Sequence, residues 1–230
     1  MSLYAWILCG SFIIPFLFSF DKRIAYYKQW PALFAGIFVN AVFFLVWDGW
    51  FARNGIWGFN PDYVWNIRLN DLPLEEWLFF VIIPYCSIFI YVNFKVLLPR
   101  EPFAASKHHL TLFFLVFIFV LALFNTSKPY TFYNCLFASV LLFVHLLFIR
   151  STWMGYFWLA YFVHLIPFVI VNGILTGAAT PEPVVWYNEE AILGIRIYTI
   201  PVEDAIYALT CLLFPITVME YIQKKKRVRI

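Results

Sequence analysis

Charged residues are scarce in this chain. Asp, Glu, Lys and Arg make up only 13% of its 230 residues, whereas ordinary soluble domains contain roughly a quarter. Hydrophobic residues make up 63%, and the mean hydropathy is +0.81. This composition excludes a disordered chain, a coiled coil and a nucleic-acid-binding domain, and it argues strongly against a soluble enzyme. It is typical of a polytopic membrane protein.

Several motifs that carry chemistry are also missing. The chain has no G-x-G-x-x-G and therefore offers no sequence case for a bound flavin or nicotinamide, and it has no P-loop, H-E-x-x-H or G-x-S-x-G. The four cysteines stand singly in apolar stretches, without metal-ligand or disulfide spacing, and are interpreted as small buried apolar residues. No lysine lies between residues 201 and 222, which excludes a retinal Schiff base there. We expect no cofactor and no metal.

Seven apolar segments are visible. They cover residues 3–20, 30–50, 75–97, 110–124, 130–148, 154–176 and 201–222. About 20 helical residues cross a hydrocarbon core of about 30 Å. The sequence therefore predicts an all-α integral membrane protein with seven transmembrane helices, of which the fourth is the shortest. The first segment lacks the basic start and cleavage site of a signal peptide and is expected to be retained.

Lysines and arginines are distributed unevenly between the two sides of these spans. One side collects Lys22, Arg23, Lys28, Lys95, Arg100, Lys107, Arg150, Lys224, Lys225, Lys226, Arg227 and Arg229. The other side holds Arg53, Arg68, Lys128 and Arg196. The positive-inside rule then predicts an N-terminus outside the cell membrane and a cytoplasmic C-terminus. The basic tail either binds anionic lipid or only sets the topology.

Two ten-residue stretches read alike. Residues 67–76 (IRLNDLPLEE) and 195–204 (IRIYTIPVED) share an isoleucine, an arginine, a proline and a glutamate, and Glu76 corresponds to Asp204. Upstream, residues 38–41 (FVNA) resemble residues 170–173 (IVNG). The same order in both halves indicates a duplication.

The duplication predicts a domain organisation. Residues 1–105 would form a first repeat of helices 1–3, residues 106–128 a joining helix 4, and residues 129–230 a second repeat of helices 5–7. With a single joining helix, the two three-helix repeats are parallel. Both Pro-x-Glu-acid motifs then lie on the outer side and can converge on one site between the halves.

The motif acids are the candidate site residues. One Pro-x-Glu-acid sequence is also a good helix start, because proline suits the first position and acids suit the first turn. Its recurrence beside a second apolar span favours a function, since ionisable groups at the edge of hydrocarbon are costly. Glu75 and Glu76 point about 100° apart on a helix and cannot face the same place. A helix N-terminus favours their carboxylates, whereas burial favours the protonated forms.

Other polar residues are candidates for supporting roles. Asn40 and Asn172 lie inside spans, where they either form interhelical hydrogen bonds or orient a site carboxyl. Arg68 and Arg196 precede the motifs, either as outer-surface arginines or as ion-pair partners of the motif acids. Asp48 is interpreted as a cap or interface residue.

Aromatic residues form 23% of the chain. Those near the span ends fit an aromatic belt. Most phenylalanines inside the spans are expected to face lipid or the core. Aromatic rings can also stabilise a carbocation through cation–π attraction.

The doubled motif, PLEE at 73–76 and PVED at 201–204, resembles the signature of the small integral-membrane lycopene cyclases. That family comprises two-subunit bacterial enzymes, fused single chains and the cyclase domain of fungal bifunctional enzymes. Residues 193–207 are the closest match, and the resemblance covers essentially the whole chain as a fused form.

The resemblance implies an intramolecular lyase or isomerase that closes the linear ends of lycopene into rings, usually β-rings, without redox chemistry. An acid would protonate C2, the C5–C6 double bond would attack the cation at C1, and a base would remove a proton from C6. Glu75 and Glu203 are then the leading acid and base candidates, with Glu76 and Asp204 as their partners. Arg68, Arg196, Asn40 and Asn172 are supporting residues. The bilayer would supply the lycopene.

Other functions compete with this one. A carotenoid hydratase would trap the same cation with water. A small-solute transporter also suits parallel repeats, although the spans hold few polar residues to line a wetted path. A rhodopsin-like receptor or scaffold without retinal would explain seven spans but does not require two acidic motifs.

Overall fold

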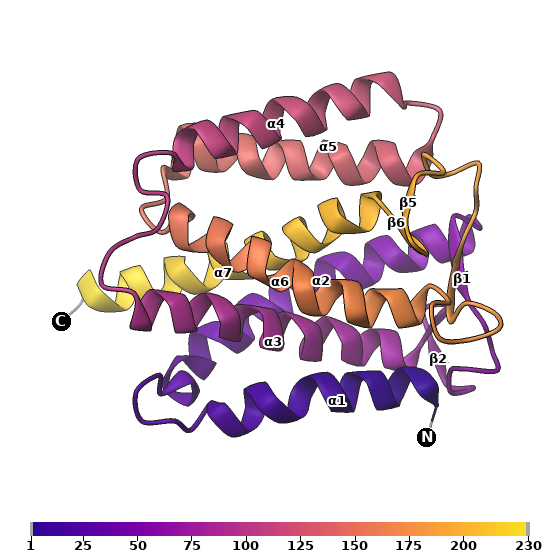
Figure 1. The fold of residues 1–230 in the computed structure, drawn as a ribbon, viewed down its shortest axis with the longest axis horizontal. Helices are drawn as coiled ribbons and strands as arrows, with labels where there is room; N and C mark the ends of the chain where they lie inside the picture. The colour runs from indigo at the N-terminus through magenta and orange to yellow at the C-terminus, as the bar shows by residue number, and fades with distance from the viewer. Residues whose placement is uncertain (1, 229–230) are drawn as a thin grey trace.

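The structure is a computed structural model that describes residues 2–228, and helices dominate it (Figure 1). The α-helices are α1 (Leu3–Phe18), α2 (Trp30–Arg53), α3 (Leu74–Leu97), α4 (Lys107–Phe124), α5 (Pro129–Val144), α6 (Met154–Leu175) and α7 (Glu203–Val228). A 3₁₀ turn, η1 (Tyr26–Gln29), leads into α2, and a π-helical turn, η2 (His145–Ile149), extends α5. The predicted all-α class is confirmed.

Six of the described helices are long and apolar enough to cross a membrane. The exception is α1, whose 16 residues rise about 24 Å. Helix α5 also has 16 residues but continues into η2, and the two together form a 21-residue apolar segment. The segment predicted to be shortest, α4, has 18 residues because Lys107, His108 and His109 join its first turn. Helix α4 is therefore longer than the apolar segment 110–124 read from the sequence.

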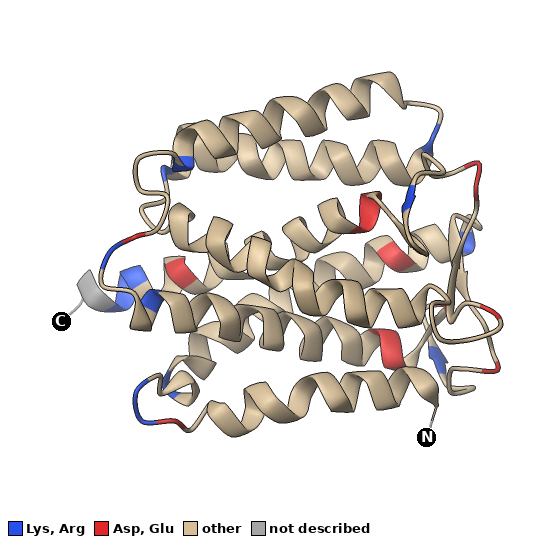
Figure 2. Ribbon diagram, in the orientation of Figure 1, with Lys and Arg blue, Asp and Glu red and all other residues tan. Residues whose placement is uncertain are grey.

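Consecutive helices run in opposite directions, so the bundle has two ends (Figure 1). The motif end holds the starts of α1, α3 and α7, and the tail end holds the end of α7. Figure 2 shows the charged residues near these ends. Arg53, Arg68, Lys128 and Arg196 belong to the motif end, and the other described lysines and arginines to the tail end. Arg229, counted with the latter, lies outside the described residues.

Short β-ribbons cover the motif end. Strand β1 (Trp57–Phe59) pairs antiparallel with β4 (Val185–Tyr187), so that the α2–α3 and α6–α7 connections meet. A Cβ on Gly58 would lie 2.2 Å from the Trp186 ring, which explains the glycine in this ribbon.

Two equivalent hairpins immediately precede α3 and α7. They are formed by β2 (Arg68–Leu69) with β3 (Leu72–Pro73), and by β5 (Arg196–Ile197) with β6 (Ile200–Pro201). Arg68 faces Pro73 across the first hairpin, and Arg196 faces Pro201 across the second. The shared sequence pattern thus corresponds to a shared local structure.

Helix packing leaves the space in which the site lies. Helix α3 packs along both α1 and α6, α2 packs against α7 and α3, and α5 packs against α4 and α7. Gly36 lets α2 approach α7 closely, since a Cβ there would lie 2.4 Å from the Pro215 carbonyl oxygen. Of the four cysteines predicted to be buried, Cys135 is, but Cys9 is exposed on α1, which corrects that expectation.

Candidate active site

A cavity of about 430 Å³ lies inside the bundle. Its walls come mainly from α1, α3, α6 and α7, and the β1–β4 ribbon closes the motif end. The polar residues of the lining include Glu76, Asp204, Asn172, Tyr4, Tyr130, Tyr187 and Tyr207, and His164, Ser11 and Ser87 also line the cavity. Residues such as Ile83, Ile90 and Leu212 make the rest of the lining largely apolar. The cavity therefore has an acidic, phenol-rich region joined to an apolar one.

The hairpins fix where the motif acids lie. The Leu74 amide donates to the Ile67 carbonyl at 2.9 Å, and the Val202 amide donates to the Ile195 carbonyl at 3.1 Å. Each helix therefore starts directly against its hairpin, with its acids in the first turn. The positive end of the helix dipole favours carboxylates at these positions.

The first acid of each motif binds the preceding loop. Glu75 Oε1 accepts a hydrogen bond from the Trp65 amide at 2.7 Å and another from the Ser2 hydroxyl. Glu203 Oε1 is held in the same way, by the Leu193 amide and the Thr131 hydroxyl, both at 2.6 Å.

Neither Glu75 nor Glu203 is among the described residues that line the cavity. Both side chains are fully buried. The second oxygen of each, Oε2, has no hydrogen-bond partner within residues 2–228. Their recorded contacts thus tie the start of α3 to its own connection and to the start of α1, and the start of α7 to its own connection and to the start of α5.

The second acid of each motif faces the cavity. Tyr4 donates to Glu76 Oε2 at 2.6 Å. Asp204 accepts three hydrogen bonds, from Tyr130 at 2.7 Å, Asn172 at 2.7 Å and Tyr187 at 2.9 Å. Helices α3 and α7 thus each bring one buried carboxyl to the same cavity, and the adjacent acids of each motif point in different directions.

A third buried carboxyl, that of Asp48, contacts the cavity-lining residue Tyr207. Asp48 of α2 is fully buried and accepts hydrogen bonds from the Tyr207 hydroxyl at 2.8 and 3.1 Å, one to each carboxyl oxygen. Sequence reasoning placed Asp48 at a cap or interface and did not single out Tyr207. No local pattern links two residues 159 positions apart, so the fold alone brings them together.

The other tyrosines were also missed, although the sequence held a signal for two of them. Tyr4 precedes Glu76 by 72 residues, and Tyr130 precedes Asp204 by 74. If the alignment of the two sequence repeats had been extended to the starts of the first and fifth apolar segments, it would have placed Tyr4 close to Tyr130.

Tyr187 lies in β4, outside the long helices. Burial raises its pKa well above the usual value of a tyrosine, and the nearby carboxyls of Asp204, Glu76 and Asp48 raise it further. Its hydroxyl therefore keeps its proton at neutral pH and acts as a donor to Asp204.

The four predicted supporting residues have different surroundings. Asn172 contacts Asp204, as described above. Asn40 is fully buried, and neither its amide nitrogen nor its oxygen has a hydrogen-bond partner within residues 2–228. Arg68 donates to the Asp71 carbonyl at 3.3 Å. Arg196 pairs with Glu189 at 2.6 Å, so the recorded contacts of both arginines are with groups other than the motif acids.

Four aromatic rings stand together around the acidic region. Trp57 lies 5.7 Å from Tyr130, 5.9 Å from Tyr187 and 6.0 Å from Tyr207, measured between ring centroids. All four rings line the cavity. Such rings attract a cation through their π faces.

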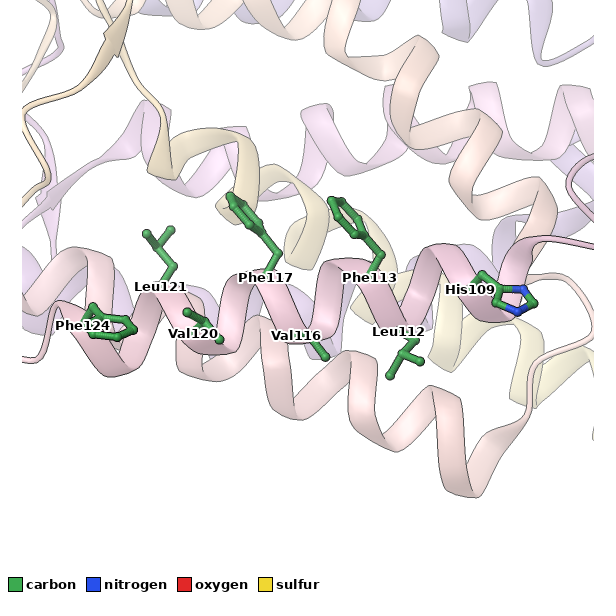
Figure 3. Close-up of a pocket in the computed structure, with 8 residues that line it drawn as sticks. All are labelled: His109, Leu112, Phe113, Val116, Phe117, Val120, Leu121 and Phe124. Atoms are coloured by element: carbon green, nitrogen blue, oxygen red, sulfur yellow. The ribbon is translucent and has the colours of Figure 1, made fainter.

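A second hollow, of about 540 Å³, is of a different kind. All eight residues that line it belong to α4 (Figure 3). They include strongly exposed phenylalanines such as Phe113 and Phe124 and no carboxyl. This hollow lies along one helix, and His109 is the one ionisable residue among the described residues that line it.

The fold and the cavity define a class of protein: an all-helical bundle with membrane-length apolar helices and an internal cavity that has an acidic, tyrosine-rich region. The family model described as lycopene cyclase matches residues 1–94 and 127–222. The chain therefore belongs to the lycopene cyclase family. Each matched part contains one Pro-x-Glu-acid motif, and α4 lies between them. The family implies an enzyme of the cyclase type and a carotenoid substrate.

Two curated relatives are fungal. Each is a bifunctional lycopene cyclase/phytoene synthase. The one from Aspergillus niger is 36% identical over 62 residues, which cover 27% of this chain and 11% of the relative. The one from Podospora anserina is 38% identical over 56 residues, which cover 24% and 9%. The aligned parts thus span about a tenth of either relative. No solved structure matches this chain.

Proposed function

We propose that this chain is a lycopene cyclase that closes the linear ends of lycopene into β-rings without redox chemistry. The observation that carries the proposal is the pair of cavity-facing carboxyls, Glu76 and Asp204, supplied by two different helices to one largely apolar cavity. The reaction needs one acid and one base at the same chain end. It also needs little water, because water would trap the cation.

The proposed reaction balances within the substrate. The acid protonates C2 of the terminal C1–C2 double bond and leaves a cation at C1. The π electrons of the C5–C6 double bond form the C1–C6 bond, which moves the cation to C5. The base removes the C6 proton, and the electron pair of that C–H bond forms the new C5–C6 double bond. One proton enters and one leaves, so the mass does not change and no electrons are transferred.

The hydrogen bonds favour one assignment of the two acids. Asp204 accepts three hydrogen bonds and Glu76 accepts one. Donors to a carboxylate stabilise its charged form. We therefore assign Asp204 as the base and Glu76 as the acid that protonates C2.

The leading candidates from the sequence receive a different role in this proposal. Glu75 and Glu203 position the catalytic carboxyls, because each ties its helix start to the loop before it and to the start of a neighbouring helix. A rigid helix start matters, since a displacement of about 1 Å in a reacting group can cost about a hundredfold in rate.

The aromatic rings and Asp48 complete the proposed site. Trp57, Tyr130, Tyr187 and Tyr207 would stabilise the carbocation through their π faces. Asp48 keeps the Tyr207 hydroxyl proton turned away from the cation, because both of its oxygens accept from that hydroxyl.

We further propose that all seven helices span the membrane as two parallel three-helix repeats, residues 1–105 and 129–230, joined by residues 106–128. The equivalent hairpins and the equivalent contacts of Glu75 and Glu203 support the repeat. The basic tail end supports a cytoplasmic C-terminus and an N-terminus outside. The exposed face of α4 would then contact lipid.

Expression in bacterial cells that accumulate lycopene tests the function. The wild-type chain is expected to convert lycopene to an isomer of equal mass that absorbs at shorter wavelength, and Glu76→Gln with Asp204→Asn is expected to abolish the conversion. A product heavier by one water would move the assignment to a hydratase. Unchanged lycopene beside folded, membrane-inserted wild-type protein would refute the proposal and make a transporter the next function to test.

A further inference from the structure

The cavity extends from the acidic residues to the outer surface of the bundle. Its lining includes Gly10 and Ile14 of α1, which are exposed, and Pro167 of α6, which is also exposed. Ile14 has 63% of its surface accessible. One continuous space thus joins the carboxyls to a helix face that would contact lipid.

We infer that a groove between α1 and α6, with α3 as its floor, admits the carotenoid from the bilayer and holds the unreacted part of the polyene while one end reacts. This inference rests on the proposed function. We call this part of the cavity the α1–α6 groove; it is lined by Gly10, Ile14, Pro15, Ile90, Pro167 and Phe168.

The helix packing creates this groove. Helix α3 packs extensively against α1 on one side and α6 on the other, whereas α1 and α6 contact each other only locally. Residues of α3 therefore remain uncovered between the two flanking helices. Phe89 and Ile90, both on α3, line the cavity there.

The shape of the space suits a long, narrow ligand. Glu76 and Ile90 both line it and are fourteen residues apart on α3, which corresponds to about 21 Å along the helix. A compact solute would not need a cavity that is extended in this way, whereas a linear polyene with a reactive end does.

The two serine hydroxyls in the apolar part are already satisfied. The Ser11 hydroxyl donates to the Ile7 carbonyl at 2.9 Å, and the Ser87 hydroxyl donates to the Ile83 carbonyl at 2.8 Å. Both bonds stay within one helix, so neither hydroxyl is free to donate to a ligand. Apart from the His164 imidazole, which lies 6.1 Å from the Phe168 ring between centroids, the residues that line the groove are apolar. The groove is therefore suited to an unsubstituted hydrocarbon chain.

Pro15 of α1 and the Cys86 thiol of α3 allow a hydrogen bond between these two helices beside the groove. Pro15 has no N–H and cannot donate to the Ser11 carbonyl four residues earlier. The Cys86 thiol of α3 donates to that carbonyl instead, at 3.4 Å. This contact links α1 to α3 beside the groove without covering it.

Gly10 allows a sharp test. A Cβ built on Gly10 meets no atom within 4 Å, so a larger side chain there enters open space. Replacement also removes the cost of glycine in a helix. The series Gly10→Ala, Gly10→Leu and Gly10→Trp should therefore keep the fold and fill the groove progressively.

The matched control is Cys9→Trp. Cys9 is the adjacent residue, is exposed on α1 and is not in the cavity lining given by the described residues. We expect kcat/KM for lycopene in vesicles to fall with side-chain size, by roughly tenfold or more for Gly10→Trp, as when access of a ligand is impeded. Cys9→Trp should match the wild type.

A binding measurement separates access from chemistry. In a Glu76→Gln background, which should bind lycopene without converting it, less lycopene should co-purify with Gly10→Trp than with Cys9→Trp. Equal rates and equal lycopene content in these two variants, beside an active wild type, would overturn the groove and leave the cyclase proposal standing. A wild type that leaves lycopene unchanged would overturn both.

Discussion

The two glutamates of the first motif should respond differently to the same substitution. Glu76→Gln keeps the shape of the side chain but removes its acidic proton. If Glu76 protonates C2, cyclisation should slow by roughly 10²- to 10⁴-fold, the usual contribution of a general acid. The fold should survive, because Tyr4 can still donate its hydrogen bond to the amide oxygen.

Glu75→Gln should mainly change stability. Its Oε1 accepts two hydrogen bonds, from Trp65 and Ser2. A hydrogen bond to a charged group contributes about 1.5–3 kcal/mol, and a neutral one about 0.5–1.5 kcal/mol. Removing the charge from both bonds should therefore cost about 2–3 kcal/mol. Glu75→Ala removes both bonds and should cost more.

The assay combines pigment conversion with thermal unfolding in detergent. We expect Glu75→Gln to unfold at lower temperature and still cyclise lycopene below that temperature, and Glu76→Gln to unfold like the wild type and be inactive. Glu203→Gln and Asp204→Asn provide the same comparison in the second motif. A folded but inactive Glu75→Gln beside an active Glu76→Gln would refute the assignment.

Three further predictions concern the Asp48–Tyr207 hydrogen bonds, the buried Asn40 amide and the close packing at Gly58. Asp48→Asn and Tyr207→Phe should each lower kcat about two- to tenfold, since a hydrogen bond contributes about 0.5–1.5 kcal/mol; the double variant should be no slower than the slower single one, and additive losses would contradict a shared role. Asn40→Leu should raise the melting temperature, because a buried amide with no hydrogen-bond partner among residues 2–228 costs about 1–3 kcal/mol; a lowered melting temperature would contradict this reasoning. Gly58→Ala should weaken the β1–β4 ribbon and make the connections more sensitive to protease, whereas unchanged proteolysis would show that the Trp186 ring can move aside.

The sequence predicted the features that depend on local patterns. Long apolar runs predicted the helices, and proline followed by acids predicted the starts of α3 and α7. The first segment was predicted to reach residue 20, but α1 ends at Phe18, where the Ser19 hydroxyl bonds to Tyr85 of α3. That contact joins residues 66 positions apart and left no local signal.

The orientation of the acids could not be predicted. Helical geometry requires Glu75 and Glu76 to diverge, but it does not say which of them faces the ligand. That choice depends on Tyr4 of α1 and on the loop residue Trp65, which only the fold brings to α3. Arg68 and Arg196 illustrate the opposite error: they lie close to the motif acids in sequence, whereas their contacts are with hairpin and loop groups.

The most direct test of the central claim uses purified wild-type protein in lipid vesicles that contain lycopene and no redox partner. We predict a cyclic isomer of unchanged mass, formed by the wild type and absent with Glu76→Gln and Asp204→Asn, each folded as judged by thermal unfolding. Cyclisation that persists in these two variants would contradict the assignment of the cavity carboxyls.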